Sequence, residues 1–450
     1  MWLPLDVSQC IEALEGASFP TYAVGGCVRD ALLGLTPHDF DLCTAATPEQ
    51  IQSVFHDHRL VLAGVKHGTV GVVCPNGIVE ITTFRTEGGY DDCRHPSWVK
   101  FVPTIEEDLA RRDFTVNAMA WSPTRGFADP FGGQDDLKNH ILRAVGDPVC
   151  RFQEDALRIL RGVRFSVKYG LIPDSPTEQA MFSQAHLMDH LAAERVFDEL
   201  CKLILYVSTD DLIRFAPIIT QVIPELAPAV GFDQRTRHHV YDLFTHIAHV
   251  TAAVPADLTL RWAALLHDVG KPATFTLDEN GQGHFYGHAK VSAQIASEIL
   301  HRLKAPTALR EQVVLLIEQH MVKPEANRQF LRRRLSRLGS ETLHLLLALQ
   351  RADMGGKGTG IPSEADEWAQ IDHIVQEIEA ENACLTMKDL AVNGRDLMDL
   401  GFAPGKELGI CLKTLLEQVV DERLPNDKAI LLSAAKNEYF TFPPQDTNYG

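Results

Sequence analysis

Two aspartates one residue apart, Asp39 and Asp41, end the stretch YAVGGCVRDALLGLTPHDFDL (residues 22–42). The run FDL is expected to finish a half-buried strand, and because side chains alternate along a strand, both carboxylates would point to the same side of the sheet. Two like charges so close are costly to bury without a cation between them. The pair therefore predicts a divalent metal site, with Glu80 of VEITTFR as a third carboxylate on a neighbouring strand.

The same stretch carries other parts of a nucleotide site. Gly25 and Gly26 precede the predicted helix VRDALLG, where backbone N–H groups at a helix start can meet phosphate oxygens. Arg29 lies one turn into that helix, and its guanidinium can take a triphosphate oxygen bidentately. Mg²⁺ held by Asp39 and Asp41 would bridge the triphosphate and an incoming hydroxyl. The alternative is a surface turn with two solvated aspartates, and DxD alone does not exclude it.

A second stretch, EDALRILRGVRF, has the residue types that can read a base edge. On a predicted helix Asp155 and Arg158 lie three residues apart and share a face, and Arg161 and Arg164 continue the basic stripe. A carboxylate beside a guanidinium matches an edge with an amino donor next to a ring-nitrogen acceptor, which cytosine and adenine present. Guanine and uracil would leave both protein groups mismatched at about 1–3 kcal/mol each. An exposed helix with an internal ion pair is the alternative.

A third set of residues has the donors of a metal site. His267 and Asp268 are adjacent at a predicted helix end in LLHDVGKP, where both can reach one ion. His246 and Asp353 offer ligands from other helices and complete a set of N and O donors. Three other histidines, His238, His239 and His249, compete for the role of first ligand, and His246 is chosen among them from its spacing alone. His288 and His320 could extend the site to a second metal.

These residues fall on two kinds of structure. Residues 21 to about 145 mix β-rich runs such as GTVGVVC with helical stretches, whereas from about 146 onward helical patterns follow one another. The expected fold class is α+β, with a mixed sheet and helices first and only helices afterwards. Breakers near 146–148, 172–179 and 355–367 mark joints. The predicted domains are residues 1–145, 146–205, 206–360 and 361–450.

Composition narrows the class of protein. Of the 450 residues, 45% are hydrophobic and 23% charged, as expected of a globular chain. No uninterrupted apolar run is long enough to cross a membrane, and the N-terminus lacks the basic start of a secretory signal. Nine cysteines without a CxxC pair favour reduced thiols in the cytoplasm. A net charge of −18 restricts nucleic-acid binding to local basic patches.

The first motifs resemble a known family. GGCVRDALLG followed by DFDL is similar to the signature of the class II tRNA nucleotidyltransferases, the CCA-adding enzymes related to bacterial poly(A) polymerases. The likeness continues through FRTEGGYDDCRHP, EEDLARRDFTVNAMAW, DPFGGQDDL, EDALRILRGVRF and NGRDLMDLGFAPGKELG. It implies a nucleotidyltransferase palm followed by a helical neck, with tRNA, CTP and ATP as partners and Mg²⁺ as cofactor.

The resemblance also assigns roles to residues. Asp39 and Asp41 would be metal ligands, Gly26 and Arg29 would contact the nucleotide, and Asp155 and Arg158 would be the family's base-reading pair. In LARRDFTVNAM, at the head of a predicted helix, the nucleotide-contacting arginine maps to Arg112. Asp113 and Asn117, one helical turn apart, would hold the ribose or brace that arginine. Their alternative role is to cap the helix. The Gly-rich loop at 86–101 favours use of CTP, and of both nucleotides.

HDVGKP resembles the HD superfamily of metal phosphohydrolases. This likeness implies a second divalent metal, Mn²⁺, Ni²⁺ or Fe²⁺, at His246, His267, Asp268 and Asp353, with phosphohydrolase activity as an option beside a purely structural domain. The densest basic run, RQFLRRRLSRLG at residues 328–339, either follows a tRNA backbone or is a solvated helix face.

The expected function is CCA addition to tRNA by two-metal phosphoryl transfer. A poly(A) polymerase or an enzyme that adds only CC or only A would share every residue named. An HD phosphohydrolase with a nucleotide-sensing palm is an alternative from another class. A non-catalytic RNA-binding module fits poorly, because it has no use for a paired-carboxylate metal site and is usually more basic.

Overall fold

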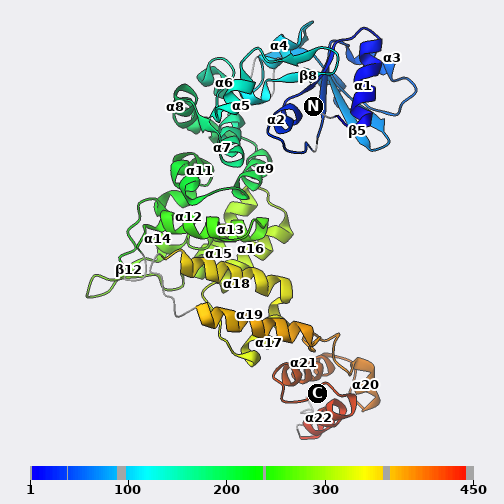
Figure 1. The fold of residues 1–450 in the computed structure, drawn as a ribbon. Coiled ribbons are helices and arrows are strands. Elements are labelled where there is room, and N and C mark those ends of the chain that lie inside the picture. The colour runs from blue at the N-terminus through cyan, green and yellow to red at the C-terminus, as the bar shows by residue number, and fades with distance from the viewer. Residues whose placement is uncertain (1–2, 38, 89–97, 237–239, 358–364, 442–450) are drawn as a thin grey trace, which may run out of the picture. The chain divides into compact units, whose positions relative to one another are not determined.

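The computed structural model describes residues 3–37, 39–88, 98–236, 240–357 and 365–441. The chain divides into two compact units. The first comprises residues 1–231, 256–261 and 297–310, and the second comprises 232–255, 262–296 and 311–450. The predicted change from mixed structure to helices is confirmed, so the fold class is α+β (Figure 1).

The first unit begins with a seven-stranded mixed sheet in the order β3-β4-β5-β2-β1-β8-β9. Strands β2 and β5 run parallel, whereas the other neighbouring pairs are antiparallel. Strands β6 and β7 form a separate antiparallel pair, and residues 89–97 of the predicted loop between them lie outside the described residues. The strands are β1 (Thr21–Val24), β2 (Asp41–Thr44), β3 (Leu60–Val61), β4 (Thr69–Cys74), β5 (Gly77–Thr83), β6 (Arg85–Gly88), β7 (Trp98–Phe101), β8 (Ala120–Ser122) and β9 (Gly126–Ala128).

Helices cover this sheet and bury its apolar residues. Helices α1 and α3 contact each other and the sheet (Figure 1). A cluster that includes Val24, Phe84 and Leu109 joins strand residues to α4 and excludes water from the sheet near the site. The helices of this region are α1 (Leu5–Gly16), α2 (Gly26–Leu32), α3 (Pro48–Val54), α4 (Ile105–Leu109) and α5 (Gly133–Lys138).

Helices then follow one another within the first unit. Helix α7 packs on α9, and α6 packs on α8. A short parallel pair, β10 with β11, ties the approach to α6 to the segment after α7. The elements are β10 (Ile141–Leu142), α6 (Pro148–Glu154), α7 (Leu157–Tyr169), β11 (Ile172–Pro173), α8 (Ser175–Ser183), α9 (Ala193–Ile204), α10 (Thr209–Arg214) and α11 (Ala216–Val222).

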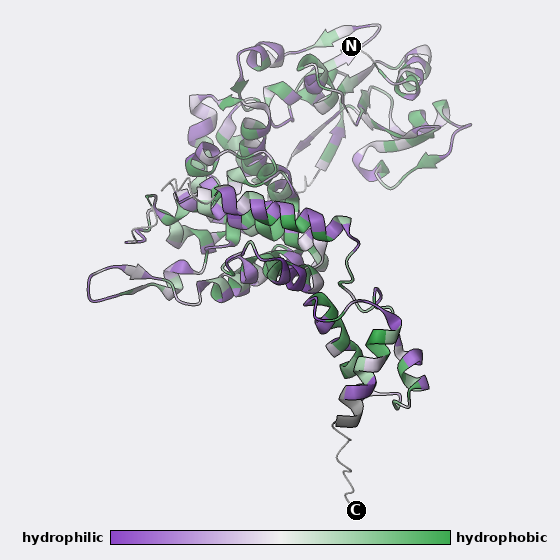
Figure 2. Ribbon diagram, turned by 60° about the horizontal axis from the view of Figure 1, so that its bottom comes forward, coloured by the Kyte–Doolittle hydropathy of each residue, from purple (hydrophilic) through white to green (hydrophobic). Residues whose placement is uncertain are grey.

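From residue 232 the described chain is helical apart from the short hairpin β12–β13. Figure 2 shows hydrophobic and hydrophilic residues alternating along these helices, as expected of helices that each bury one face. No helix among the described residues is long and apolar enough to cross a lipid bilayer. The elements are α12 (Leu243–Ala253), α13 (Leu258–Leu266), α14 (Lys271–Thr274), β12 (Thr276–Leu277), β13 (Gly283–His284), α15 (His288–Arg302), α16 (Thr307–Gln319), α17 (Arg328–Leu338), α18 (Ser340–Gly355), α19 (Ala365–Ala380), α20 (Gly394–Asp399), α21 (Lys406–Val420) and α22 (Lys428–Thr441).

Candidate functional site

The paired aspartates lie at the start of strand β2. Asp41 is its first residue and is paired in register with Glu80 of the parallel strand β5, so the two carboxylates share a face of the sheet. The prediction placed both aspartates on one strand, but Asp39 lies before β2, so only Asp41 belongs to the strand. Burial raises the pKa of Asp41; the charge of Arg112 lowers it and the charge of Asp39 raises it again. Among the described residues these carboxylates do not converge within 4.8 Å as a set of three.

Gly25 lets two parts of the site approach closely. It precedes α2 with φ +72°, in the left-handed region that glycine adopts without strain. A Cβ at this position would lie 2.8 Å from Nη1 of Arg112. The glycine therefore gives the Arg112 guanidinium room beside the start of α2.

Arg29 is held by several partners. Its Nε and Nη2 donate to Oδ1 of Asp30 at 2.8 and 2.7 Å, and its Nη1 donates to Oδ1 of Asn117 at 2.6 Å. Nη2 also donates to the Tyr169 hydroxyl at 2.6 Å. These bonds occupy four of the five guanidinium N–H groups. The expected two-pronged grip on a triphosphate is therefore not available in this conformation, and one N–H of Nη1 is left for it.

Arg111 and Arg112 follow the end of α4 and do not head a helix, which corrects the predicted placement; only the short 3₁₀ turn Thr115–Asn117 comes after them. Both bind the fully buried Asp108, with Arg111 Nη2 at 2.9 Å and Arg112 Nη2 at 3.3 Å. Burial alone would raise the pKa of Asp108, but the two guanidinium groups outweigh it and lower that pKa. Sequence reasoning missed Asp108, although its i, i+3 and i, i+4 spacing to the arginines was a usable signal.

Asp108→Asn is expected to destabilise the fold by about 3 kcal/mol at pH 7, because it removes a fully buried carboxylate from two half-buried guanidinium groups that depend on it. The folded pKa of Asp108 is depressed, so its contribution is present above the unfolded pKa of about 3.9 and is lost as the pH falls through the lower folded value. Urea unfolding from pH 7 to pH 3 should therefore show the gap between wild type and variant narrowing below about pH 4.

The exposed Asp135 on α5 provides the matched control for that experiment. Asp135→Asn should change stability by less than about 0.5 kcal/mol. A gap for Asp108→Asn no larger than this control would contradict the role assigned to Asp108.

Asp155 and Arg158 do not share one continuous helix. Helix α6 ends at Glu154, and Asp155 sits in extended conformation before α7, where its Oδ1 accepts from the Leu157 N–H at 3.1 Å. The predicted i, i+3 relation on a helix is therefore wrong, because the chain breaks at Asp155. Both side chains nevertheless line the same pocket.

Each member of that pair is held by another residue. Asp155 accepts from Arg195 of α9, with Nη2 to Oδ2 at 2.8 Å and Nη1 to Oδ1 at 3.4 Å. Arg158 binds Oε2 of Glu154 at 2.7 Å and donates to the Arg111 carbonyl at 3.1 Å. Because each group has a fixed partner, a base edge would meet an acceptor and a donor that are already oriented. Sequence reasoning missed Arg195, which is 40 positions from its partner.

Arg195→Ala is expected to loosen Asp155 and to relax the choice of nucleotide. A charged contact through two N–H groups is worth about 1.5–3 kcal/mol. Its loss should lower the preference for CTP and ATP over GTP and UTP roughly tenfold. Competition between nucleotides at a tRNA 3′ end measures this ratio. Lys202→Ala on the same helix is the control, because Lys202 pairs with the exposed Asp198 and is not among the residues that line the pocket. An unchanged ratio in Arg195→Ala would contradict the role of Arg195 in orienting Asp155.

The remaining predicted residues form one network. Asp113 binds Nε and Nη2 of Arg161 at 2.8 and 2.7 Å, and its Oδ1 accepts from Asn117 at 3.1 Å. Arg164 binds Glu199 of α9 at 2.6 Å. Although burial alone would raise the pKa of Asp113, Arg161 and Asn117 lower it below its usual range. Asp113 and Asn117 thus brace Arg161 and Arg29.

These groups line one pocket of about 440 Å³ within the first unit. Seven arginines and three aspartates (Asp41, Asp113 and Asp155) line it, so the guanidinium groups outnumber the carboxylates and the pocket is suited to a polyanion. Neither Asp39 nor Glu80 is among its lining residues, which are Gly25, Gly26, Arg29, Asp41, Arg111, Arg112, Asp113, Asn117, Asp155, Leu157, Arg158, Arg161, Arg164, Phe165 and Arg195.

The second unit holds a buried cluster of histidines and aspartates. His246 Nε2 lies 3.3 Å from His267 Nε2, 3.3 Å from Asp268 Oδ2 and 3.1 Å from Asp353 Oδ1. The four residues predicted from the sequence are thus brought together. Tyr241 stacks on the competing His249 at 4.4 Å between ring centroids, and His238 and His239 lie outside the described residues.

The histidines are oriented as metal ligands usually are. The Nδ1 atoms of His246, His267 and His320 each face a backbone carbonyl, at 3.1, 2.7 and 2.6 Å. A nitrogen that faces a carbonyl must carry the proton, so Nε2 is left to point into the cluster. Burial lowers the pKa of His246, but hydrogen bonds to the two aspartates outweigh it and raise that pKa to about 9.

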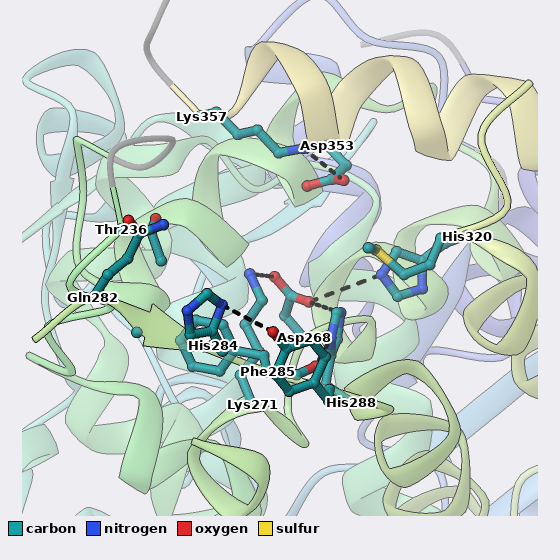
Figure 3. A pocket seen from close by; sticks show the side chains of 13 residues that line it. Thr236, Asp268, Lys271, Gln282, His284, Phe285, His288, His320, Asp353 and Lys357 are labelled. Atoms are coloured by element: carbon teal, nitrogen blue, oxygen red, sulfur yellow. Dashed lines mark hydrogen bonds and ion pairs between the residues drawn. The ribbon is translucent and has the colours of Figure 1, made fainter. Parts of the chain in front are cut away.

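A second group of ligands shares Asp268. Its Oδ1 lies 3.3 Å from His288 Nε2 and 3.9 Å from His320 Nε2 (Figure 3). Asp268 Oδ2 lies 2.7 Å from Lys271 Nζ and within 3.3 Å of Nε2 of both His246 and His267. Buried imidazole nitrogens and carboxylate oxygens that converge in this way are the N and O donors that divalent cations of the transition series prefer. The cluster opens to a pocket of about 430 Å³, which Lys271 and Lys357 also line.

The basic run on α17 serves the chain's own structure. Arg332 donates to the carbonyls of Val419 and Val420 at the end of α21, at 3.1 and 2.8 Å, and Arg333 pairs with Asp421 at 2.6 Å. Arg328 binds Glu381 and Glu422, and Arg334 binds Gln319. The run is therefore neither a free stripe nor merely a solvated face.

A mixed sheet with exposed carboxylates thus lies beside an arginine-lined pocket, and the helices that follow the sheet line the same pocket. This arrangement is suited to holding a nucleoside triphosphate next to a metal site. Three family models match the chain: the poly A polymerase head domain at residues 21–143, the RNA and SrmB-binding site of polymerase A at 170–229, and tRNA nucleotidyltransferase domain 2 at 283–435.

Relatives and solved structures match nearly the whole chain. The CCA-adding enzyme of Latilactobacillus sakei is 35% identical and the match covers 95% of this chain and 96% of the relative; that of Limosilactobacillus fermentum is 33% identical over 94% of each. The crystal structure of the Bacillus stearothermophilus CCA-adding enzyme in complex with CTP is 27% identical, with a TM-score of 0.70 over 98% of this chain and 99% of that one. The chain belongs to the CCA-adding enzyme family.

Proposed function

We propose that this protein adds CCA to the 3′ end of tRNA, with CTP and ATP as substrates. The observation that carries the proposal is the shared pocket: a fixed carboxylate and a fixed guanidinium, Asp155 and Arg158, line the same cavity as Asp41 and the arginines. Cytosine and adenine both fit that acceptor and donor, whereas the triphosphate fits the arginines. The reduced thiols of the described cysteines and the tRNA-processing relatives favour a cytoplasmic location.

In the proposed reaction the terminal hydroxyl oxygen of tRNA attacks the α-phosphorus of the nucleotide. A phosphodiester bond forms, the bond to pyrophosphate breaks, and the hydroxyl proton is released. Asp39 and Asp41 would hold Mg²⁺, with Glu80 paired in register with Asp41. Mg²⁺ held there would lower the pKa of the attacking hydroxyl and offset the charge of the leaving pyrophosphate. The mutual repulsion of Asp39 and Asp41 is the observation that fits such a cation.

The protein's own groups position the nucleotide. Arg29, Arg112 and Arg161 orient the triphosphate and ribose from positions fixed by Asn117, Asp108 and Asp113 in turn. In this proposal the chain has four domains. They are a palm at residues 1–145, a base-reading neck at 146–205, a helical domain at 206–360 and a helical tail at 361–450.

The test supplies purified protein and Mg²⁺ with tRNA transcripts that end before, within and after CCA. Each nucleotide is given singly and in combination, and product ends are sequenced. Products that stop at one CCA support the proposal. CC alone or A alone would assign a partial enzyme, and long A tails would assign a poly(A) polymerase. No extension of any transcript would overturn the transferase.

We also propose that the histidine–aspartate cluster binds divalent metal, Mn²⁺, Ni²⁺ or Fe²⁺, and supports phosphoester hydrolysis. The specific observation is that two buried groups of His and Asp ligands share Asp268 and open to a pocket that Lys271 and Lys357 also line. Bound metal would supply a nucleophilic hydroxide at neutral pH. If this hydrolysis were the main activity and the palm only a sensor, Asp39→Ala would leave the main activity intact.

A further inference from the structure

The last residue of helix α7, Tyr169, reaches across to the arginine at the phosphate side of the pocket. Its hydroxyl accepts from Nη2 of Arg29 at 2.6 Å, and its ring centroid lies 4.3 Å from the Arg29 Cζ. Phe165, one turn earlier on α7, lies 5.2 Å from the same carbon. Two aromatic rings of α7 therefore support a guanidinium that belongs to α2.

The other contacts of Arg29 leave its orientation dependent on this support. Asp30 and Asn117 each offer it a single oxygen atom, so neither forms a two-oxygen clamp. The hydroxyl of Tyr169 takes the remaining N–H of Nη2, and its ring restricts the tilt of the plane. One N–H of Nη1 then stays available on a side chain that is buried but lines the pocket.

Helix α7 also carries the groups on the base side of the pocket. Arg158 of α7 donates to the Arg111 carbonyl at 3.1 Å, and Arg161 binds Asp113 at 2.7 Å. The Arg29–Tyr169 bond is thus a third link between α7 and the sheet-bearing region, and it is the link on the phosphate side.

We propose that Tyr169, backed by Phe165, is a positioning residue that fixes the Arg29 guanidinium for the nucleotide triphosphate and so couples the triphosphate site to the base-reading helix. This inference rests on the proposed function of the pocket. Because CTP and ATP share the triphosphate, loss of the contact should weaken both equally. A change at Asp155 or Arg158 would instead alter the choice between bases.

Tyr169→Phe, which keeps the ring and removes the hydroxyl, tests the proposal. KM for CTP with tRNA that lacks CCA, and KM for ATP with tRNA that ends in CC, should each rise about tenfold, the lower end of the effect expected for one hydrogen bond to a charged group. Tyr169→Leu, which also removes the ring, should raise both by about thirtyfold. The thermal midpoint of Tyr169→Phe should match that of wild type.

The matched control is Tyr206→Phe, an exposed tyrosine on the same unit, which should leave both KM values unchanged. Arg29→Ala combined with Tyr169→Phe should be no worse than Arg29→Ala alone, because the hydroxyl acts through the arginine. Unchanged KM values in Tyr169→Phe, additive losses in the double variant, or an effect on one nucleotide only would each overturn the proposal.

Equilibrium dialysis of labelled CTP with the full chain, without tRNA, separates this inference from the proposed function. A weaker Kd in Tyr169→Phe supports the positioning role even if no tRNA is extended. An unchanged Kd in a protein that does bind CTP rejects it, whatever the transfer assay shows.

Discussion

Asp41→Asn is expected to lower kcat/KM for nucleotide addition by about 10³-fold or more. The substitution removes one of two negative charges that would hold Mg²⁺, and such charge stabilisation is worth several kcal/mol, at 1.36 kcal/mol for each factor of ten. Asp41 is the first residue of β2 and is not part of the buried core that the other three residues of the strand form, so the fold should persist. Single-turnover extension of a tRNA that lacks CCA measures the loss.

Glu49→Gln provides the control for charge alone, because Glu49 is an exposed residue in the first turn of α3. It should leave the rate unchanged. Retention of more than a tenth of the wild-type rate by Asp41→Asn would contradict the metal-ligand role and move attention to Asp39 and Glu80.

Asp268→Asn is expected to remove bound divalent metal from the second unit completely. Asp268 belongs to both ligand groups of the cluster, whereas Asp353 belongs to the first group only. Metal analysis after loading with Mn²⁺ and desalting should give about two ions per chain for wild type, about one for Asp353→Asn and about none for Asp268→Asn. Phosphoester hydrolysis should disappear with the metal.

Nucleotide addition serves as the internal control, because all residues of the arginine-lined pocket lie in the first unit. Addition by Asp268→Asn should stay within about twofold of wild type, a difference smaller than 0.5 kcal/mol in barrier. Equal metal content in the three proteins would reject the shared-ligand arrangement.

The sequence was sufficient for features set by neighbouring residues. The adjacent ligands His267 and Asp268 were visible as a pair in the sequence, and the structure brings them together with His246 and Asp353 as predicted. Gly25 and Gly26 lie at the predicted turn into α2, and Arg29 lies on that helix as predicted. The α+β division followed from the change in hydrophobic period near residue 146.

Features that depend on tertiary contacts could not be predicted. The break at Asp155 has no Gly or Pro to announce it, and its side chain is stabilised by Arg195 from another helix. The placement of Arg111 and Arg112 depends on the buried Asp108, whose burial no local pattern reveals. The sequence predicted one helix through Asp155 and another that begins at Arg111, and the structure has neither. Helix propensity could not show this, because contacts with distant residues decide where these helices begin and end.

The internal pairing of the arginines on α17 has a consequence for how this protein responds to salt. Binding a polyanion normally releases condensed counterions, and each phosphate neutralised adds to the slope of log K against log salt. Guanidinium groups already neutralised by Asp421, Glu381 and Glu422 would first have to leave those carboxylates. They would then release few ions on contact with RNA. The salt slope of tRNA binding should therefore depend little on Arg328, Arg332 and Arg333, although α17 is the densest basic run in the sequence.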